Sequence, residues 1–185
     1  MTARALIAVA DGVEDLETVT LIDVLRRAEV ETVVASIENR RMFTAARGTR
    51  LTADAMLVDV LAQDFDLIVL PGGMPGAQHL AEHAPLGEKV RAQAKAGKLF
   101  AAICAAPALA LQDYGVLRQR RMTCYPAFSD RLSGCTFVDL PVVVDGNCIT
   151  SQGPATALAF ALTLVEQLVG KARRKAVAEA MLVPV

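Results

Sequence analysis

Four short apolar segments alternate with longer amphipathic ones, and this alternation constrains the fold more than any other feature of the chain. The segments are RALIAVA (4–10), VETVVASI (30–37), DLIVLP (66–71) and KLFAAIC (98–104). Continuous apolar runs of this length are typical of strands buried on both faces, as in parallel sheets. Because parallel strands need a crossover connection, we expect helices between them.

Five intervening or following segments have helical character. The predicted helices cover residues 14–29, 54–63, 85–97, 106–115 and 154–170. The first opens with acidic residues and closes with arginines, as the helix macrodipole favours. Gly97 is a plausible C-terminal cap, and the last helix has Pro154 at its start and Gly170 at its end, which matches the usual placement of these residues.

Three further segments add irregular or antiparallel structure. ENRRMFTAARGTR (38–50) predicts a hairpin or a loop, RMTCYP (121–126) a short strand, and TFVDLPVVVDGNCITSQG (136–153) a hairpin with DGN at its turn. We find no repeat, linker or low-complexity tract. The sequence therefore predicts one domain over residues 1–185, an α/β fold whose doubly wound, mostly parallel sheet is sandwiched by helices.

Charge and hydropathy exclude some kinds of partner. The 19 lysines and arginines are balanced by 20 acidic residues, so no net field attracts nucleic acid or anionic lipid. The basic run KARRK (171–175) is expected on a solvated helix face. No apolar run reaches the length of a membrane span, and MTARALIAVADG lacks the shape of a signal peptide. We expect a cytoplasmic protein that binds neither nucleic acid nor membranes.

The cysteines and histidines give no metal-binding pattern. The four cysteines form no CxxC pair, and a cytosolic domain of this size has little need of disulfides. His79 and His83 are four residues apart without the glutamate of an HExxH motif. With Pro85 close behind, both are expected on a short exposed helix. We therefore expect no metal and no organic cofactor.

One cysteine lies where a site is expected. In open α/β sheets, ligands bind beyond the carboxyl ends of the strands, and Cys104 ends the strand predicted at 98–104. A strand-to-helix turn leaves backbone N–H groups free to stabilise an anion, which would lower the pKa of the Cys104 thiol. The alternative is a cysteine that only packs in the core.

Two other strand ends carry unusual residues. Gly72 and Gly73 follow the strand at 66–71, and glycines there allow backbone N–H groups to face an oxyanion; the alternative is a tight turn without a ligand. PGGMPG matches neither the dinucleotide nor the P-loop motif. Glu17 lies beyond the first acidic turn of its helix. Beside a thiolate it would have a raised pKa and could donate a proton, although the residues alone favour an ordinary helix carboxylate.

Several blocks of the sequence also resemble a known family. ALIAVADGVEDLETVTLIDVLRRA, DLIVLPGGMPGAQHL, AAICAAPALAL and ITSQGPATALAFAL closely resemble the ThiJ/PfpI superfamily, and within it the branch of the parkinsonism-associated protein deglycase (DJ-one) and bacterial YajL. The resemblance implies a flavodoxin-like sandwich and a homodimer. It implies a reactive cysteine at Cys104, a glutamate at Glu17 that hydrogen-bonds its sulfur, and backbone oxyanion donors at Gly73 and Ala105.

The resemblance also suggests pocket residues and shows departures. It places positive charge near the pocket, or around the dimer contact, at Arg27 and Arg47. Members that hydrolyse peptides or act as glyoxalase chaperones commonly have a histidine beside the cysteine, whereas residue 105 here is alanine, so a Cys–His–Asp triad is poorly supported. Tyr125 replaces a histidine of the human-type branch, which leaves the helix glutamate as the main acid–base group. Cys124 either lines the pocket as a resolving thiol or fills the core.

Two function classes follow from the resemblance. In the first, Cys104 adds to glyoxal, methylglyoxal or the related adducts on glycated side chains, Glu17 shuttles a proton, and a hydroxy acid is released without a cofactor. In the second, Cys104 is an oxidative-stress sensor or the switch of a redox-dependent chaperone, oxidised to a sulfinate that Glu17 holds. A cysteine peptidase is a third, weaker reading because of Ala105.

Overall fold

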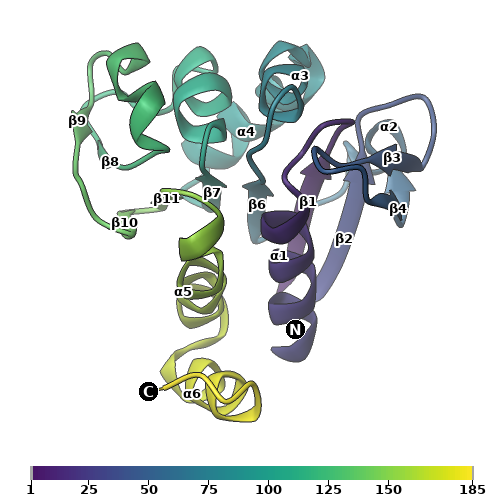
Figure 1. Ribbon diagram of the computed structural model, residues 1–185, viewed down its shortest axis with the longest axis vertical. Helices are drawn as coiled ribbons and strands as arrows, with labels where there is room; N and C mark the ends of the chain where they lie inside the picture. Colours follow the sequence, from purple (N-terminus) through teal and green to yellow (C-terminus); the bar gives the residue numbers. More distant parts are fainter. Residues whose placement is uncertain (1, 185) are drawn as a thin grey trace.

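The computed structural model describes residues 2–184 and is built around a seven-stranded sheet (Figure 1). The strands of this sheet are β1 (Arg4–Val9), β2 (Glu31–Ser36), β5 (Ala55–Met56), β6 (Leu67–Leu70), β7 (Leu99–Ile103), β10 (Val142–Asp145) and β11 (Cys148–Ser151). Their order across the sheet is β10-β11-β7-β6-β1-β2-β5. β10 runs antiparallel to β11, and the other neighbours are parallel.

The five central strands have the flavodoxin-like order. Numbered by themselves, β2, β1, β6, β7 and β11 lie in the order 2-1-3-4-5, which places the switch point of the winding between β1 and β6. All four predicted apolar strands are present, and the predicted doubly wound, mostly parallel sheet is confirmed. The carboxyl ends of β1, β6 and β7 consequently lie side by side.

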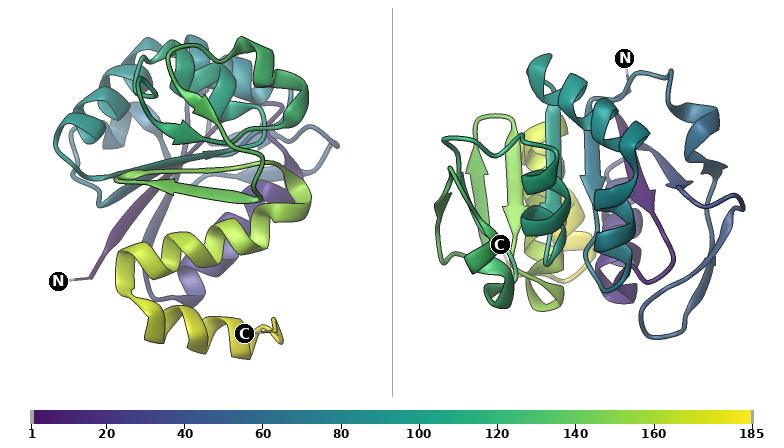
Figure 2. Two further views of the ribbon diagram at one scale, coloured as in Figure 1. Left: turned by 90° about the vertical axis from the view of Figure 1, so that its left-hand side faces the viewer. Right: turned by 90° about the horizontal axis from the view of Figure 1, so that it is seen from above.

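Helices cover both faces of the sheet, as Figures 1 and 2 show. One face carries α3 (Gly76–Glu82), α4 (Ala84–Lys95) and the π-helical turn η1 (Pro107–Leu111), and the other carries α1 (Asp15–Arg27) and α5 (Ala157–Val169). The last helix, α6 (Lys171–Ala180), packs outside α5. No helix within residues 2–184 combines the length and the apolar character needed to cross a membrane.

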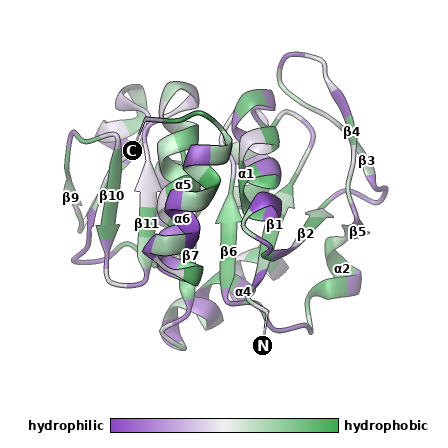
Figure 3. Cartoon of the chain, turned by 90° about the horizontal axis from the view of Figure 1, so that it is seen from below, coloured by the Kyte–Doolittle hydropathy of each residue, from purple (hydrophilic) through white to green (hydrophobic). Residues whose placement is uncertain are grey.

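Burial explains why the central strands are apolar throughout. The side chains of β6 are all buried, and those of β1 and β7 are buried except at the first residue of each. Figure 3 shows β6 coloured as hydrophobic, whereas α6 is hydrophilic over much of its length. The strands therefore gain stability from the removal of apolar surface on both faces, and the basic run of α6 remains half-buried or exposed, as expected.

The remaining elements are short. They are the antiparallel hairpin β3 (Met42–Thr44) and β4 (Arg50–Thr52), the helix α2 (Leu57–Val60), the parallel pair β8 (Arg121–Met122) and β9 (Thr136–Phe137), and the 3-10 turns η2 (Pro126–Arg131) and η3 (Pro154–Thr156). Of the hairpin or loop expected at residues 38–50, the structure has the hairpin, although its second strand runs on to Thr52. The antiparallel pair β10–β11 is also present, with its turn at Gly146.

Two sequence-based expectations for helices are wrong in part. The segment 54–63 begins as β5, because Asp54 exchanges two hydrogen bonds with the backbone of Val34, of 2.8 and 2.9 Å, and so extends the sheet before α2 starts. His79 lies on α3, but His83 lies in extended conformation between α3 and α4. There its Nδ1 accepts a hydrogen bond from the Leu86 N–H at 3.2 Å, so that His83 caps the N-terminus of α4.

Candidate active site

Cys104 lies on a strained turn directly after β7. Its φ is 63°, in the left-handed region that residues other than glycine rarely adopt. Two backbone hydrogen bonds hold it there: its N–H donates to the Ser151 carbonyl at 3.0 Å, and its carbonyl accepts the Tyr125 N–H at 2.7 Å. Such strain persists only where the surroundings determine it, and it is typical of functional sites. The half-buried thiol therefore projects beyond the end of the sheet.

Glu17 is a buried carboxyl in the first turn of α1, beside Asp15, and not beyond that turn as the sequence suggested. Its side chain is 0% exposed, and its Oε2 accepts the Gly72 N–H at 2.8 Å. Its Oε1 makes no hydrogen bond to any residue from 2 to 184. Burial raises the pKa of Glu17 from 4.5 to about 7, against the opposing effects of Gly72 and of the Cys104 thiol. Oε1 is thus a buried oxygen without a hydrogen-bond partner in residues 2–184, on a carboxyl that interacts with the Cys104 thiol.

The thiol itself is harder to ionise than the sequence predicts. Burial, followed by the negative charge of Glu17, raises the pKa of Cys104 to about 12. The backbone N–H groups of Gly73 and Ala105 oppose this shift, as expected, but do not outweigh it. The expectation of a lowered thiol pKa is therefore wrong, and burial is the main reason. Protonation of Glu17 removes the second cause of the shift, its negative charge, but burial continues to raise the pKa of the Cys104 thiol.

Gly72 and Gly73 act differently from one another. The Gly72 N–H is engaged by Glu17, so it is not a free oxyanion donor. A Cβ at Gly72 would lie 2.5 Å from the Cys104 Cβ and 2.9 Å from the Glu17 Oε2, so glycine is required for the close approach of these groups. Gly73 has a φ of 89°, which glycine tolerates, and its N–H faces the sulfur.

A pocket of about 330 Å³ opens over the thiol. The residues that line it are Glu14, Ala46, Arg47, Gly73, Met74, Cys104, Ala105, Tyr125, Phe128 and Pro154. Arg47 lies 3.8 Å from the Glu14 carboxylate and is exposed. The lining contains both polar and apolar side chains, which suits a small ligand held by a few oriented groups.

The structure does not bring every expected residue to this pocket. Arg27 forms an ion pair of 2.7 Å with Asp23 and lines a separate hollow against α6; a role at a dimer contact stays a prediction. Cys124 is buried, with its Sγ 3.4 Å from the Tyr125 carbonyl, and is not among the lining residues. His79 also lies outside the lining, with its Nδ1 3.1 Å from the Asp11 carbonyl.

Sequence reasoning missed five lining residues, of which Ala46 lies on the loop between β3 and β4. Glu14 and Met74 stand within the two strand-end motifs already noted, so the strand-end rule could have found them. Phe128 belongs to a segment that carries no motif for a site, and the sequence predicts Pro154 only as the start of a helix; the packing of η2 and η3 brings both to the pocket.

The fold and the site together define a class: α/β proteins that present a cysteine on a strained turn after a central strand. The sequence model of the DJ-1/PfpI family matches residues 3–167, and the chain belongs to this family. The solved structure of oxidized Toxoplasma gondii DJ-1 superposes with a TM-score of 0.97 at 38% identity and covers 100% of both chains.

Curated relatives agree with this assignment. Protein DJ-1 homolog B of Arabidopsis thaliana is 47% identical over 171 residues, 92% of this chain. The chain spans 39% of the length of that relative and 47% of the length of its paralogue, homolog A. The glutathione-independent glyoxalase DJR-1.2 of Caenorhabditis elegans is 37% identical over 162 residues, which cover 86% of this chain and 85% of the relative.

The raised pKa of Glu17 predicts a pH-dependent stability. Between pH 4.5 and 7 the folded protein retains a proton at Glu17 that the unfolded chain releases, so stability falls as the pH rises through this window. A pKa shift of this size corresponds to about 3 kcal/mol of the free energy of unfolding, and this contribution is fully lost above pH 7. Glu17→Gln removes the titration and should therefore gain about 3 kcal/mol relative to the wild type between pH 4.5 and 8.

Urea unfolding of both proteins at several pH values measures this difference. Glu88→Gln, which changes an exposed carboxyl on α4, is the matched control and should follow the wild type. If the wild type and Glu17→Gln lose stability in parallel across the window, Glu17 does not retain its proton in the folded state.

Proposed function

We propose that this protein converts 2-oxoaldehydes to 2-hydroxy acids without glutathione, with Cys104 as nucleophile and Glu17 as proton carrier. The observation that carries the proposal is the buried Glu17, whose Oε1 has no hydrogen bond to residues 2–184 and which shifts the pKa of the adjacent thiol. A carboxyl with a pKa of about 7 can both accept and donate a proton near neutral pH. The glyoxalase name of the Caenorhabditis elegans relative supports the same reaction class.

The reaction begins with addition of the Cys104 sulfur to the aldehyde carbon of R–CO–CHO. The thiol proton passes to the aldehyde oxygen, which gives a hemithioacetal. The N–H groups of Gly73 and Ala105, which face the sulfur, are placed to stabilise the negative charge that develops on this oxygen. Gly72 is not used in this step because its N–H holds Glu17 in place.

A proton shift and a hydrolysis complete the reaction. The Glu17 carboxylate removes the proton from the former aldehyde carbon and returns it to the neighbouring ketone carbon, whose oxygen also gains the hydroxyl proton of the hemithioacetal. The first carbon is thereby oxidised to a thioester and the second is reduced to an alcohol. Water attacks the thioester, the carbon–sulfur bond breaks, and R–CHOH–COOH leaves as the sulfur recovers its proton.

The same addition extends to early adducts of oxoaldehydes with amino or thiol side chains. Release of the adduct as a hydroxy acid would restore the free side chain, so the site would act as a deglycase. Every step uses protein groups and water. Cys104, Cys124, Cys135 and Cys148 are free thiols, which fits a reducing compartment, and we place the activity in the cytoplasm.

The activity is tested by turnover of methylglyoxal by the purified protein. Cys104→Ala should abolish formation of the hydroxy acid, and Glu17→Gln should lower kcat by about 10²- to 10⁴-fold, the usual contribution of a positioned acid–base group. Cys135→Ala changes a half-buried thiol outside the pocket and should retain wild-type turnover. Unchanged turnover in Cys104→Ala would refute the proposal.

A second function is favoured by the same unbonded carboxyl oxygen. A sulfinate at Cys104 has acceptor oxygens, and a protonated Glu17 could donate a hydrogen bond to one of them through Oε1. Such a bond would favour the sulfinate over further oxidation. We therefore propose redox sensing, or a redox-dependent chaperone activity, as the alternative role of this site.

Oxidation with modest peroxide, followed by intact mass and peptide mapping, tests this alternative. Cys104 should gain two oxygen atoms, whereas the buried thiols Cys124 and Cys148 should remain reduced. In Glu17→Leu, Cys104 should continue to the sulfonate because the stabilising donor is absent. Equal oxidation of all four thiols would show that Cys104 has no redox chemistry of its own.

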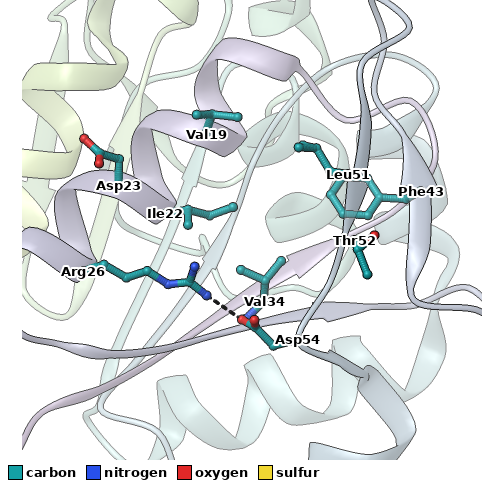
Figure 4. A pocket seen from close by; sticks show the side chains of 9 residues that line it. All are labelled: Val19, Ile22, Asp23, Arg26, Val34, Phe43, Leu51, Thr52 and Asp54. Carbon is teal, nitrogen blue, oxygen red and sulfur yellow. Dashed lines mark hydrogen bonds and ion pairs between the residues drawn. The ribbon is translucent and has the colours of Figure 1, made fainter.

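We further propose that the protein is a homodimer that associates through α1 and the β3–β4 hairpin. A hollow of about 330 Å³ lies between these elements (Figure 4). It is lined by Val19, Ile22, Asp23, Arg26, Val34, Phe43, Leu51, Thr52 and Asp54. Leu16, Val19 and Met42 are 52%, 45% and 51% exposed, so apolar side chains remain available for a second copy.

Light scattering after size exclusion at micromolar concentration tests the dimer. Val19→Arg places a charge in the proposed contact and should shift the protein to the monomer mass. Val58→Arg is the matched control, because Val58 is 69% exposed on α2, away from the hollow. A monomeric wild type, or a dimer that Val19→Arg leaves intact, would exclude this surface.

A further inference from the structure

An aromatic wall, formed by Tyr125 and Phe128, borders the pocket above Cys104. The two ring centroids are 6.4 Å apart with an interplanar angle of 59°, an edge-to-face type of arrangement. Both residues line the pocket, together with the apolar side chains of Met74 and Pro154. Tyr125 is 44% exposed, so its ring has surface left for contact with a ligand.

A backbone hydrogen bond connects the aromatic wall to Cys104. The Tyr125 N–H donates to the Cys104 carbonyl at 2.7 Å, and the Phe128 N–H donates to the Tyr125 carbonyl at 2.9 Å. A Cβ at Gly153 would lie 3.3 Å from the Tyr125 Cδ2, so the ring packs against the backbone there. These contacts hold the wall at a set position relative to the sulfur, as a specificity element requires.

The charges at the rim balance one another. Arg47 lies 3.8 Å from the Glu14 carboxylate, and both residues line the pocket. A ligand with a net charge would therefore meet an attractive and a repulsive group together. A neutral, apolar substituent meets no such conflict and removes apolar surface from water when it reaches the aromatic wall.

We propose that the aromatic wall binds the substituent on the ketone carbon of the substrate, so that the protein prefers 2-oxoaldehydes with an aromatic or bulky apolar substituent over glyoxal and methylglyoxal. This inference rests on the proposed function. The pocket volume of about 330 Å³ is within the range of small-molecule sites. It leaves room for a substituent larger than a methyl group once the aldehyde has reacted with Cys104.

The test compares kcat/KM for phenylglyoxal and for methylglyoxal. The wild type should favour phenylglyoxal, and Tyr125→Ala and Phe128→Ala should each lower its kcat/KM by about 5- to 20-fold, in line with the contribution of aromatic contacts in apolar pockets. The kcat/KM for methylglyoxal should fall by a clearly smaller factor than that for phenylglyoxal in both variants, since a methyl group makes less contact with the wall. Tyr125→Phe retains the ring and should keep the preference.

Leu140→Ala, an exposed apolar position outside the pocket, is the matched control and should leave both values unchanged. Thermal melting confirms that each variant is folded, and intact mass detects any reaction of phenylglyoxal with arginine side chains. If both substrates lose the same factor in Tyr125→Ala and Phe128→Ala, or the wild type favours methylglyoxal, this inference is wrong although the proposed function stands. If the wild type converts neither aldehyde, the proposed function itself fails.

Discussion

The hydrogen bond from the Gly72 N–H to the buried carboxyl of Glu17 is the interaction on which the site depends. It joins α1 to the turn after β6, and it occupies one carboxyl oxygen so that the other is left beside Cys104. A carboxyl in this position costs free energy when ionised, because burial disfavours the charge. The same cost keeps a proton available next to the Cys104 thiol, which is the property that both proposed functions require.

The sheet supplies the geometry for this arrangement. β1, β6 and β7 are neighbours in the parallel sheet. The segment leading to α1, the turn at Gly72 and Gly73, and Cys104 therefore follow adjacent strand ends. A side chain at Gly72 would clash with both reactive groups. The close contact of Glu17 and Cys104 thus depends on a backbone position without a Cβ. The strained φ of Cys104 is maintained by its bonds to Ser151 and Tyr125.

The sheet and part of the site were predictable from sequence for physical reasons. Apolar runs identify buried strands, and strand ends locate sites, so Cys104 and Gly73 could be proposed from position alone. Glu17 could not be separated from an ordinary helix acid, because its burial depends on packing between distant elements. The raised pKa of Cys104 is a consequence of that burial and of Glu17 itself. Phe128 reaches the pocket through irregular segments that have no periodic pattern.

The central claim is that Glu17 is protonated near neutral pH, and infrared spectroscopy of its carboxyl group tests it most directly. Difference spectra between the wild type and Glu17→Gln, recorded from pH 4 to 8, isolate the carbonyl band of a protonated Glu17 from the other carboxyl groups. The account predicts that this band persists well above pH 4.5 and titrates near pH 7 or higher. A band that disappears around pH 4.5 would show an ordinary carboxylate and would contradict the raised pKa of Glu17.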